Sequence, residues 1–239
     1  MSITASASLL SDRIITCARC PRLVEYRVEV ARRYAHLYPG EEFWAKPVPG
    51  YGDPRARLLI VGLAPAARGG NRTGRVFTGD ESGNNLARAL YEAGLANQPY
   101  STHRDDGLEL RGTYLTAAVK CVPPDNRPTR REVLNCLDYL VEEIKLLRNA
   151  RVFLALGSIA WSSLTSAVAR ALGAPGWRPP PFKHGLEESL HTERRGVVHL
   201  MASYHPSPRN VRTGLLKLEE LVNILKRASR LAGLEGGGS

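Results

Sequence analysis

The fold is decided by the stretch from Leu58 to Asp80, which reads L-L-I-V-G-L-A-P-A-A-R-G-G-N-R-T-G-R-V-F-T-G-D. It starts with an uninterrupted apolar run, 58–63, of the kind that forms a strand buried on both faces. A loop rich in Gly, Pro and other small residues follows, and a helical pattern begins after Ser82. A strand, a glycine-rich loop and a helix in this order place a ligand site at the carboxyl edge of a sheet.

Similar apolar runs alternate with helical patterns along the rest of the chain. We expect strands at Arg57–Leu63, Gly112–Val119, Val152–Leu156 and Val197–Ala202. Helices are expected at Ser11–Tyr38, from Ser82 to Gly94, from Thr129 to Leu147, and at Ile159–Leu172 and Leu215–Leu231. The alternation predicts an α/β fold whose parallel sheet is covered by helices on both faces.

The connecting segments are expected to be irregular, and they do not divide the chain. Residues 41–57 and 173–196 are rich in Pro and in turn-forming residues, which disfavours regular structure. No internal repeat or linker interrupts the pattern. We therefore expect one domain over residues 1–232 and a flexible tail at 233–239, which ends in Gly-Gly-Gly-Ser.

The composition suggests a polyanionic partner. The 239 residues carry a formal net charge of +10, and such an excess of Lys and Arg makes nucleic acid the first candidate. No apolar run approaches the roughly 20 residues that cross a bilayer, and the amino terminus lacks the features of a signal peptide. The expectation is a cytoplasmic protein with no membrane partner.

The four cysteines indicate a metal site. Cys17 and Cys20 form a C-x-x-C pair, and Cys121 and Cys136 lie far along the chain. Disulfides are rare in a reducing compartment, so one site built from all four thiolates is favoured over free buried thiols. The spacing does not distinguish zinc from an iron–sulfur cluster.

Polar residues follow the predicted strands where their carboxyl ends meet. Asp80, Asn126 and His205 each lie in a loop after a strand, and the topology predicts that they converge on one crevice. The first loop lacks the Gly-Lys-Ser/Thr ending of a phosphate-binding loop, and its glycines do not fit a dinucleotide fingerprint. Phe77 in that loop is either a packing residue or a platform on which a planar base stacks.

The loop after the last strand combines rigidity with positive charge. His205 is followed by Pro206 and Pro208, and a hydrogen-bond donor in such a loop suits a base that gains negative charge. We expect the polar and basic residues beside it to contact a phosphate backbone, as Ser207, Arg209, Asn210 and Arg212.

Several motifs in order resemble the uracil-DNA glycosylase superfamily. They are G-L-A-P-A at 62–66, N-R-T-G-R and F-T-G-D within 71–80, C-V-P-P-D-N-R-P-T at 121–129 and S-Y-H-P-S at 203–207. The branch that the chain resembles is the fifth family, the type-b enzymes. The resemblance extends from Cys17 to the last helix and covers nearly the whole chain.

The resemblance implies a fold, a cofactor and an activity. The fold would be a three-layer α/β/α sandwich with a central four-stranded parallel sheet. A 4Fe-4S cluster would be held by Cys17, Cys20, Cys121 and Cys136. The activity would be monofunctional hydrolysis of the bond between deoxyribose and uracil, or another deaminated or damaged base, once that base has left the stack. The partner would be double-stranded DNA, single-stranded DNA would also be a substrate, and the protein would act as a monomer.

Two departures from better-known branches concern the base pocket. Most relatives carry a polar or acidic residue early in the first motif, but here Gly62, Leu63 and Ala64 offer no such side chain. The resemblance assigns the water to Asn126 instead, with Asp80 as the nearby carboxylate. Where most relatives have an asparagine that reads uracil, this chain has Ala117. Loss of that reader should widen the substrate range, because a dedicated hydrogen-bonding site is what rejects the wrong base.

The expected mechanism therefore gives each residue a role. The flipped base stacks on Phe77, His205 hydrogen-bonds the departing base, and Asn126 with Asp80 orients water. No lysine is placed as a nucleophile, so no strand cleavage is expected. The alternative is a metal-containing module that binds nucleic acid without chemistry.

Overall fold

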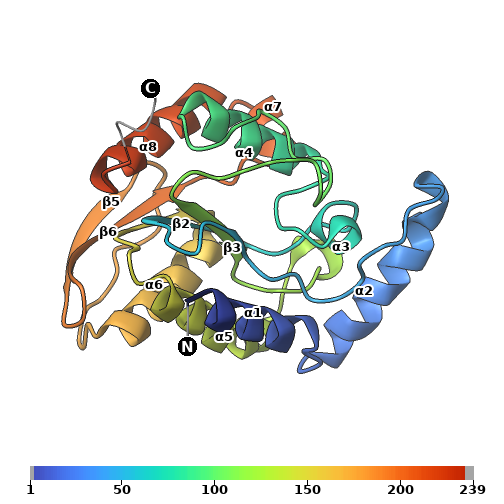
Figure 1. Ribbon diagram of the computed structural model, residues 1–239, viewed down its shortest axis with the longest axis horizontal. Helices are drawn as coiled ribbons and strands as arrows, with labels where there is room; N and C mark the ends of the chain where they lie inside the picture. The colour runs from blue at the N-terminus through green and yellow to red at the C-terminus, as the bar shows by residue number, and fades with distance from the viewer. Residues whose placement is uncertain (1–2, 235–239) are drawn as a thin grey trace.

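The computed structural model describes residues 3–234, which form a six-stranded sheet between two layers of helices (Figure 1). The strand order is β1-β3-β2-β4-β6-β5. The strands are β1 Tyr51–Gly52, β2 Leu58–Gly62, β3 Thr113–Ala117, β4 Val152–Leu156, β5 Glu187–Thr192 and β6 Gly196–Ser203. The four central strands, β3, β2, β4 and β6, pair in parallel, as the sequence predicted.

The helices cover both faces of the central strands. One layer contains α1 (Ile3–Ile15), α5 (Arg130–Leu146) and α6 (Ser158–Leu172), and the other contains α4 (Glu81–Glu92) and α8 (Leu218–Leu231) (Figure 1). Every residue of β2 and β4 is buried, because these strands lie between two apolar cores. This confirms the predicted α/β/α sandwich and explains the unbroken apolar runs.

The two edge strands were not predicted. Both β1 and β5 pair antiparallel with their neighbours. The first is only two residues long, and the second, E-E-S-L-H-T, is polar and mostly exposed on one face. Neither segment has the apolar run that revealed the central strands, because an edge strand has one partner and one solvated side.

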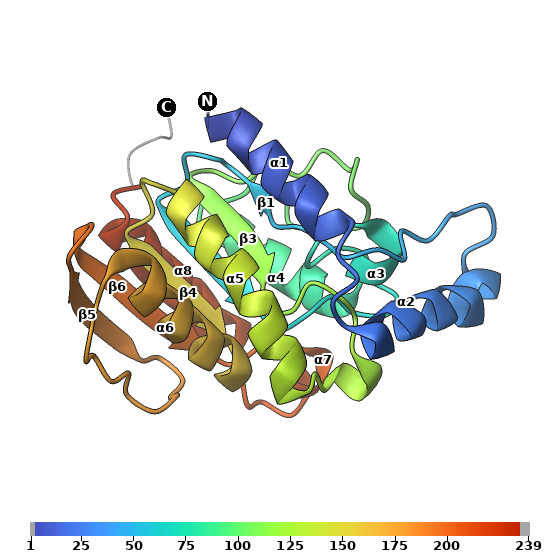
Figure 2. The same cartoon turned by 90° about the horizontal axis from the view of Figure 1, so that it is seen from below.

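The amino-terminal segment forms two helices where a single one, Ser11–Tyr38, was predicted. Helix α1 ends at Ile15, residues 16–20 form a turn, and α2 covers Pro21–Tyr34 before a 3₁₀ turn, η1, at Ala35–Leu37. Pro21 occupies the first helical position of α2, where its missing N–H costs nothing, but it could not continue an existing helix. Figure 2 shows α2 extending away from the body of the protein.

Three short helices shape the loops at the carboxyl edge of the sheet. They are α3 Gly70–Thr73, η2 Pro124–Asn126 and α7 Pro208–Arg212. The capping box predicted for α5 is present, with the Thr129 hydroxyl and the Glu132 carboxylate each accepting from the other's backbone N–H. Of the tail expected at 233–239, residues 235–239 lie outside the described part of the chain. No helix of residues 3–234 is long and apolar enough to span a membrane.

Candidate active site

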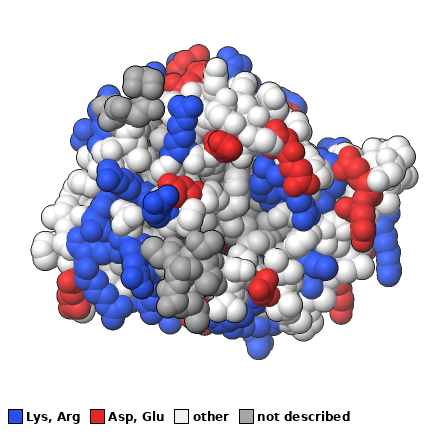
Figure 3. All heavy atoms as spheres, viewed as in Figure 1, with Lys and Arg blue, Asp and Glu red and all other residues white. Residues whose placement is uncertain are grey.

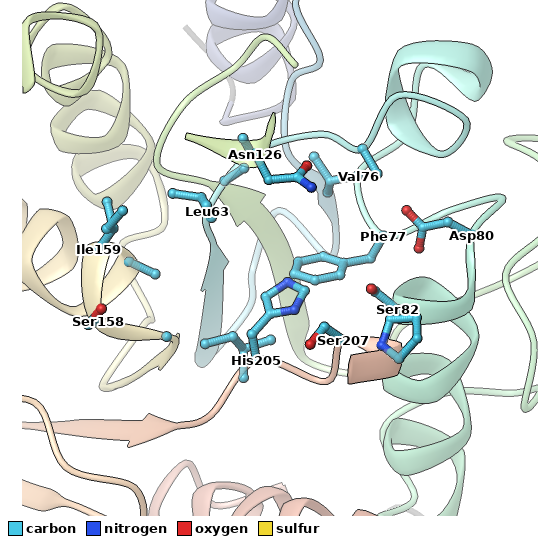
Figure 4. A pocket seen from close by; sticks show the side chains of 17 residues that line it. Leu63, Val76, Phe77, Asp80, Ser82, Asn126, Ser158, Ile159, His205 and Ser207 are labelled. Carbon is cyan, nitrogen blue, oxygen red and sulfur yellow. The ribbon is translucent and has the colours of Figure 1, made fainter. Parts of the chain in front are cut away.

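A cavity of about 370 Å³ opens at the carboxyl ends of β2, β3, β4 and β6 (Figure 4). It brings Asp80, Asn126 and His205 together, as the topology predicted. Leu63, Ala64, Phe77, Ala117 and Ser207 also line it. The remaining lining residues are Ala66, Val76, Ser82, Leu156, Gly157, Ser158, Ile159, Ala160 and Pro208.

Phe77 and His205 form the aromatic wall of the cavity. Their rings are stacked, with centroids 5.8 Å apart and planes inclined by 26°. Phe77 has a left-handed backbone, with φ of 51°, which directs its ring back over the end of β2. A Cβ at Gly62 would overlap the tip of this ring. Gly62 therefore makes room for Phe77, and it is not among the residues that line the cavity.

His205 is held as a neutral imidazole. Burial lowers its pKa to about 4, because the charged ring would lose its hydration. The Asn210 amide nitrogen donates to the His205 carbonyl oxygen at 2.8 Å and fixes the loop. Within residues 3–234 no hydrogen bond reaches the ring nitrogens, so one N–H is available to a ligand in the cavity.

Asp80 combines a structural contact with a position beside the cavity. Its Oδ1 accepts from the Gly83 N–H at 2.7 Å and caps α4. Burial raises the pKa of the carboxyl above its ordinary value, although the amides of Gly83 and Ser82 oppose this shift. A Cβ at Gly69 would overlap Oδ2. The carboxylate therefore fits beside the cavity because residue 69 is a glycine.

Asn126 reaches the cavity from the loop after β3. Asp125 and Asn126 have φ of 52° and 55°, a left-handed conformation that Asn and Asp tolerate better than other non-glycine residues. Asn126 is exposed, and Figure 4 shows its side chain projecting over the cavity above Phe77. Its amide therefore faces both the solvent and the cavity.

Comparison with known proteins identifies the family. A family model described as the Uracil DNA glycosylase superfamily matches residues 49–228. The chain is 50% identical to the type-5 uracil-DNA glycosylase of Pyrobaculum aerophilum over 93% of its length and 92% of that protein. It is 48% identical to the type-5 protein of Thermus thermophilus, over 92% of this chain and 96% of that one. This chain belongs to the uracil-DNA glycosylase superfamily. A type-4 uracil-DNA glycosylase of P. aerophilum is 35% identical, over 83% of this chain and 81% of that protein.

The superfamily resemblance pointed to Ala117, and the structure places this residue at the end of β3, where it lines the cavity. With Ala64 and Leu63 it forms an apolar part of the wall. The start of α6 was missed as a lining segment, although Gly157-Ser158 follows a predicted strand. A small, flexible pair directly after a buried strand is the signal that could have found it.

The four candidate DNA-binding residues differ in their contacts: two shape the loop after β6, and two are arginines at its surface. The Ser207 hydroxyl caps α7 by accepting from the Asn210 N–H at 3.2 Å. Ser207 and Asn210 thus hold the loop in shape. Arg212 pairs with Glu81 at 2.6 Å, and Arg209 is exposed without an ion-pair partner among residues 3–234.

The four cysteines of this superfamily member line a second, small cavity. Cys17 and Cys20 lie around the turn before α2, Cys121 follows β3, and Cys136 is in α5. All four are free of disulfides. Burial raises the pKa of Cys136 to about 12, so a thiolate there would need a nearby cation.

Four cysteine thiols are a donor set that zinc and iron–sulfur clusters both use. Within residues 3–234 no three His, Cys, Asp or Glu side chains are grouped as ligands of one metal ion. A 4Fe-4S cluster needs a wider arrangement, since each cysteine binds a different iron. N–H groups of Arg27 and Asn135 approach Cys121 Sγ at 3.4 Å and Cys20 Sγ at 3.3 Å. Such donors are the usual partners of cluster sulfurs.

Lys120 is committed to a buried ion pair. Its ammonium donates to Glu143 at 2.8 Å and to the Thr116 hydroxyl at 2.6 Å. Both charged side chains are at most 2% exposed. Lys120 lines the cysteine cavity, and none of the described residues that line the active-site cavity is a lysine.

Proposed function

We propose that this protein is a monofunctional uracil-DNA glycosylase that hydrolyses the N-glycosidic bond of uracil and other deaminated or damaged bases in DNA. This reaction initiates base excision repair. The observation that carries the proposal is one cavity that combines an aromatic platform, a neutral histidine, an amide and a buried carboxylate. The 50% identity to a type-5 uracil-DNA glycosylase supports the same reaction.

The target base enters the cavity after it leaves the stack. A volume of about 370 Å³ suffices for a single base and is within the usual range for ligand pockets. Phe77 offers a face for stacking, which each base accepts because each has a π-face. Flipping costs a few kcal/mol and is least costly at a mismatched or damaged base, so the energetics favour lesions before any hydrogen bond forms.

His205 stabilises the departing base. As the glycosidic bond lengthens, negative charge accumulates on the base, and an N–H donor directed at that charge lowers the barrier. A pKa of about 4 keeps the imidazole neutral at physiological pH. The ring therefore donates a hydrogen bond without transferring its proton, and the base leaves as an anion.

Asn126 and Asp80 provide the water. The exposed Asn126 amide holds a water molecule above the sugar, and the Asp80 carboxylate accepts its proton as the oxygen attacks. The same negative charge stabilises the sugar cation that develops in the transition state. Since no lysine lines the cavity, no Schiff base forms with the abasic sugar and the strand remains intact.

The small side chains of the wall favour a broad substrate range. Ala117 and Ala64 leave space beside the base and offer no hydrogen bond that distinguishes uracil from hypoxanthine or 5-hydroxymethyluracil. A site that reads by shape discriminates weakly, whereas an amide reader rejects a wrong base strongly. Double-stranded and single-stranded DNA are both proposed as substrates of the monomer, which would act on the nucleoid in the cytoplasm.

The cofactor proposed for the second cavity is a 4Fe-4S cluster held by Cys17, Cys20, Cys121 and Cys136. Its contribution would be structural, because its four ligands would join the turn between α1 and α2 to the loop after β3 and to α5. That loop also carries Asn126, five residues after Cys121. Bound there, the cluster would support the position of the Asn126 amide and would take no part in the reaction.

The decisive assay uses a duplex with a single uracil. We expect release of free uracil and an alkali-labile abasic site, with no strand break before alkali. Asn126→Ala should lower the single-turnover rate about 100-fold, the scale of a lost acid–base contribution. Arg32→Gln, on the exposed side of α2, is the control and should leave this rate unchanged. A full rate for Asn126→Ala would refute the water role. Binding without release from uracil, hypoxanthine or 5-hydroxymethyluracil duplexes would instead establish the alternative, a non-catalytic module.

A further inference from the structure

The amino edge of the sheet, opposite the cavity, carries a concentration of positive charge. Arg57 and Arg151 directly precede β2 and β4, so they lie at the amino edge of the parallel strands. Arg55, Arg148 and Arg195 join them there, and we call these five residues the amino-edge arginine cluster. Figure 3 shows Lys and Arg side chains gathered over the end of the sheet formed by β5 and β6.

Backbone contacts show that the five residues are neighbours. The Arg151 and Arg195 guanidinium groups both donate to the Ala150 carbonyl oxygen, at 3.3 and 3.1 Å. Arg151 also donates to the Arg148 carbonyl at 3.3 Å, and its backbone N–H donates to the Arg57 carbonyl at 2.9 Å. The Arg55 carbonyl accepts from the side chain of Asn149, next to Arg148, at 3.4 Å.

The cluster is an excess of positive charge, with the Asp53 carboxylate beside it, which accepts from the Arg55 backbone N–H at 2.7 Å. None of the five forms an ion pair with a carboxylate of residues 3–234. Burial and the neighbouring charge of Arg151 lower the pKa of Arg195 to about 10. Four of the five are exposed, and Arg195 is half-buried. Their contacts to neutral carbonyls fix some of the side chains but leave the positive potential in place.

The cluster and the active-site cavity face different directions. Strand β4 starts directly after Arg151, and its last residue, Leu156, lines the cavity. A strand of this length spans about 16 Å. A duplex docked over the carboxyl edge would therefore have the sheet between it and the cluster.

We propose that the amino-edge arginine cluster is a second binding surface for the phosphate backbone of DNA, distinct from the surface that presents the cavity. Guanidinium groups match phosphate geometry and carry the salt-dependent part of DNA affinity. Val197, two residues after Arg195, is exposed, but a single valine is not the aromatic or amphipathic anchor that protein interfaces and membrane-surface helices use. The protein would then bind two DNA segments at the same time and could transfer directly from one segment to the other.

The test measures whether the full-length protein bridges two duplexes. A biotinylated 20-base-pair duplex with a stable abasic analogue is fixed to beads and saturated with protein. A fluorescent undamaged duplex is then added and its retention measured. We expect retention by the native protein and an at least fivefold loss in Arg148→Gln/Arg151→Gln. The salt slope of retention should fall by about 2, one for each lost phosphate contact.

The substitutions spare the structural arginines. The Arg151 side chain contacts only backbone carbonyls of its own loop, whereas Arg195 and Arg57 also hydrogen-bond Ile144 and Gly233 and are left unchanged. Arg178→Gln/Lys226→Gln removes the same charge from exposed positions outside the cluster and should retain the second duplex within twofold. The melting temperature of each variant verifies folding.

Three results would overturn the proposal. Equal retention by native protein and Arg148→Gln/Arg151→Gln would mean that bridging comes from another surface or from a dimer. A reduced single-turnover rate of the same variant on a short uracil duplex would assign the cluster to the DNA surface of the active site. Cluster-dependent binding to phosphatidylserine vesicles without retention of the duplex would identify a lipid surface. The rate assay also separates failure of this proposal from failure of the proposed glycosylase.

Discussion

Two side chains of the cavity, Phe77 and Asp80, each fit only because the residue they pack against is a glycine. Gly62 lies beneath the tip of the Phe77 ring, and Gly69 lies against Oδ2 of Asp80. From the sequence, the glycines of this segment indicated only a loop after a strand. In the structure these two also set the positions of an aromatic ring and a carboxylate, which depends on tertiary packing and is not encoded in local spacing.

Gly69→Ala should displace Asp80 and slow base excision about 100-fold, while the fold persists. The added methyl group would overlap the carboxylate, and loss of an aligned acid–base group costs roughly this factor. Single-turnover kinetics on a uracil duplex measure the change. Gly176→Ala adds a methyl group at an exposed turn with nothing within 4 Å and should leave the rate unchanged. A native rate in Gly69→Ala would show that the position of Asp80 is not critical.

The acid limb of the pH–rate profile should belong to Asp80. Burial raises the pKa of its carboxyl, so the active, ionised form is lost at a higher pH than for an ordinary aspartate. His205 has a pKa of about 4 and stays neutral across this range, so it adds no second limb near pH 6. Single-turnover rates from pH 4.5 to 9 measure the profile. In Asp80→Asn the limb should disappear and leave a low, flat rate, and a persistent limb would assign it to another group.

At the scale of elements, a strand could be predicted from the sequence where both of its faces are buried. The central strands were predicted because both of their faces are covered, and their apolar runs need no partner to be recognised. Strands β1 and β5 and the break between α1 and α2 were not predicted, since edge pairing and a proline start are weak local signals. The convergence of Asp80, Asn126 and His205 was predicted from topology. The pairing of Lys120 with Glu143 was not, because it links the segment after β3 to α5 only once the helix has docked.

Glu132 joins two helices, and its removal should loosen both. Its carboxylate caps α5 through the Thr129 N–H and pairs with Arg22 of α2 at 2.7 Å. Arg22 lowers the pKa of Glu132, so this stabilisation is present above the unfolded pKa and is lost as pH falls through the folded one. Glu132→Ala should cost about 1–2 kcal/mol in urea unfolding at pH 7. Glu132→Gln keeps the cap and should cost less. No loss in Glu132→Gln would leave the ion pair without a role, and equal losses in the two variants would leave the cap without one.

At the scale of the whole molecule, stability depends on a charge pair inside the layer between sheet and helices. Glu143→Gln would leave the Lys120 ammonium buried without its counterion, which costs about 3–5 kcal/mol. Urea unfolding measures this loss. Glu142→Gln is the matched control. The Glu142 carboxylate pairs with Arg13 at a site where both side chains are at least 35% exposed, so this substitution should cost under about 1 kcal/mol. Similar losses in the two variants would contradict the burial argument.

The packing of α1 on α5 has a consequence for synthesis. Helix α1 is synthesised before α5, and its partner surface, which includes Tyr139, is more than a hundred residues away along the chain. At elongation rates of 5–20 residues per second, α1 waits roughly ten seconds for α5. During that time its apolar side, with Leu10 and Ile14, has no native surface to cover it. Until α5 has been synthesised, α1 is therefore a segment whose apolar side chains need protection, of the kind that a chaperone gives.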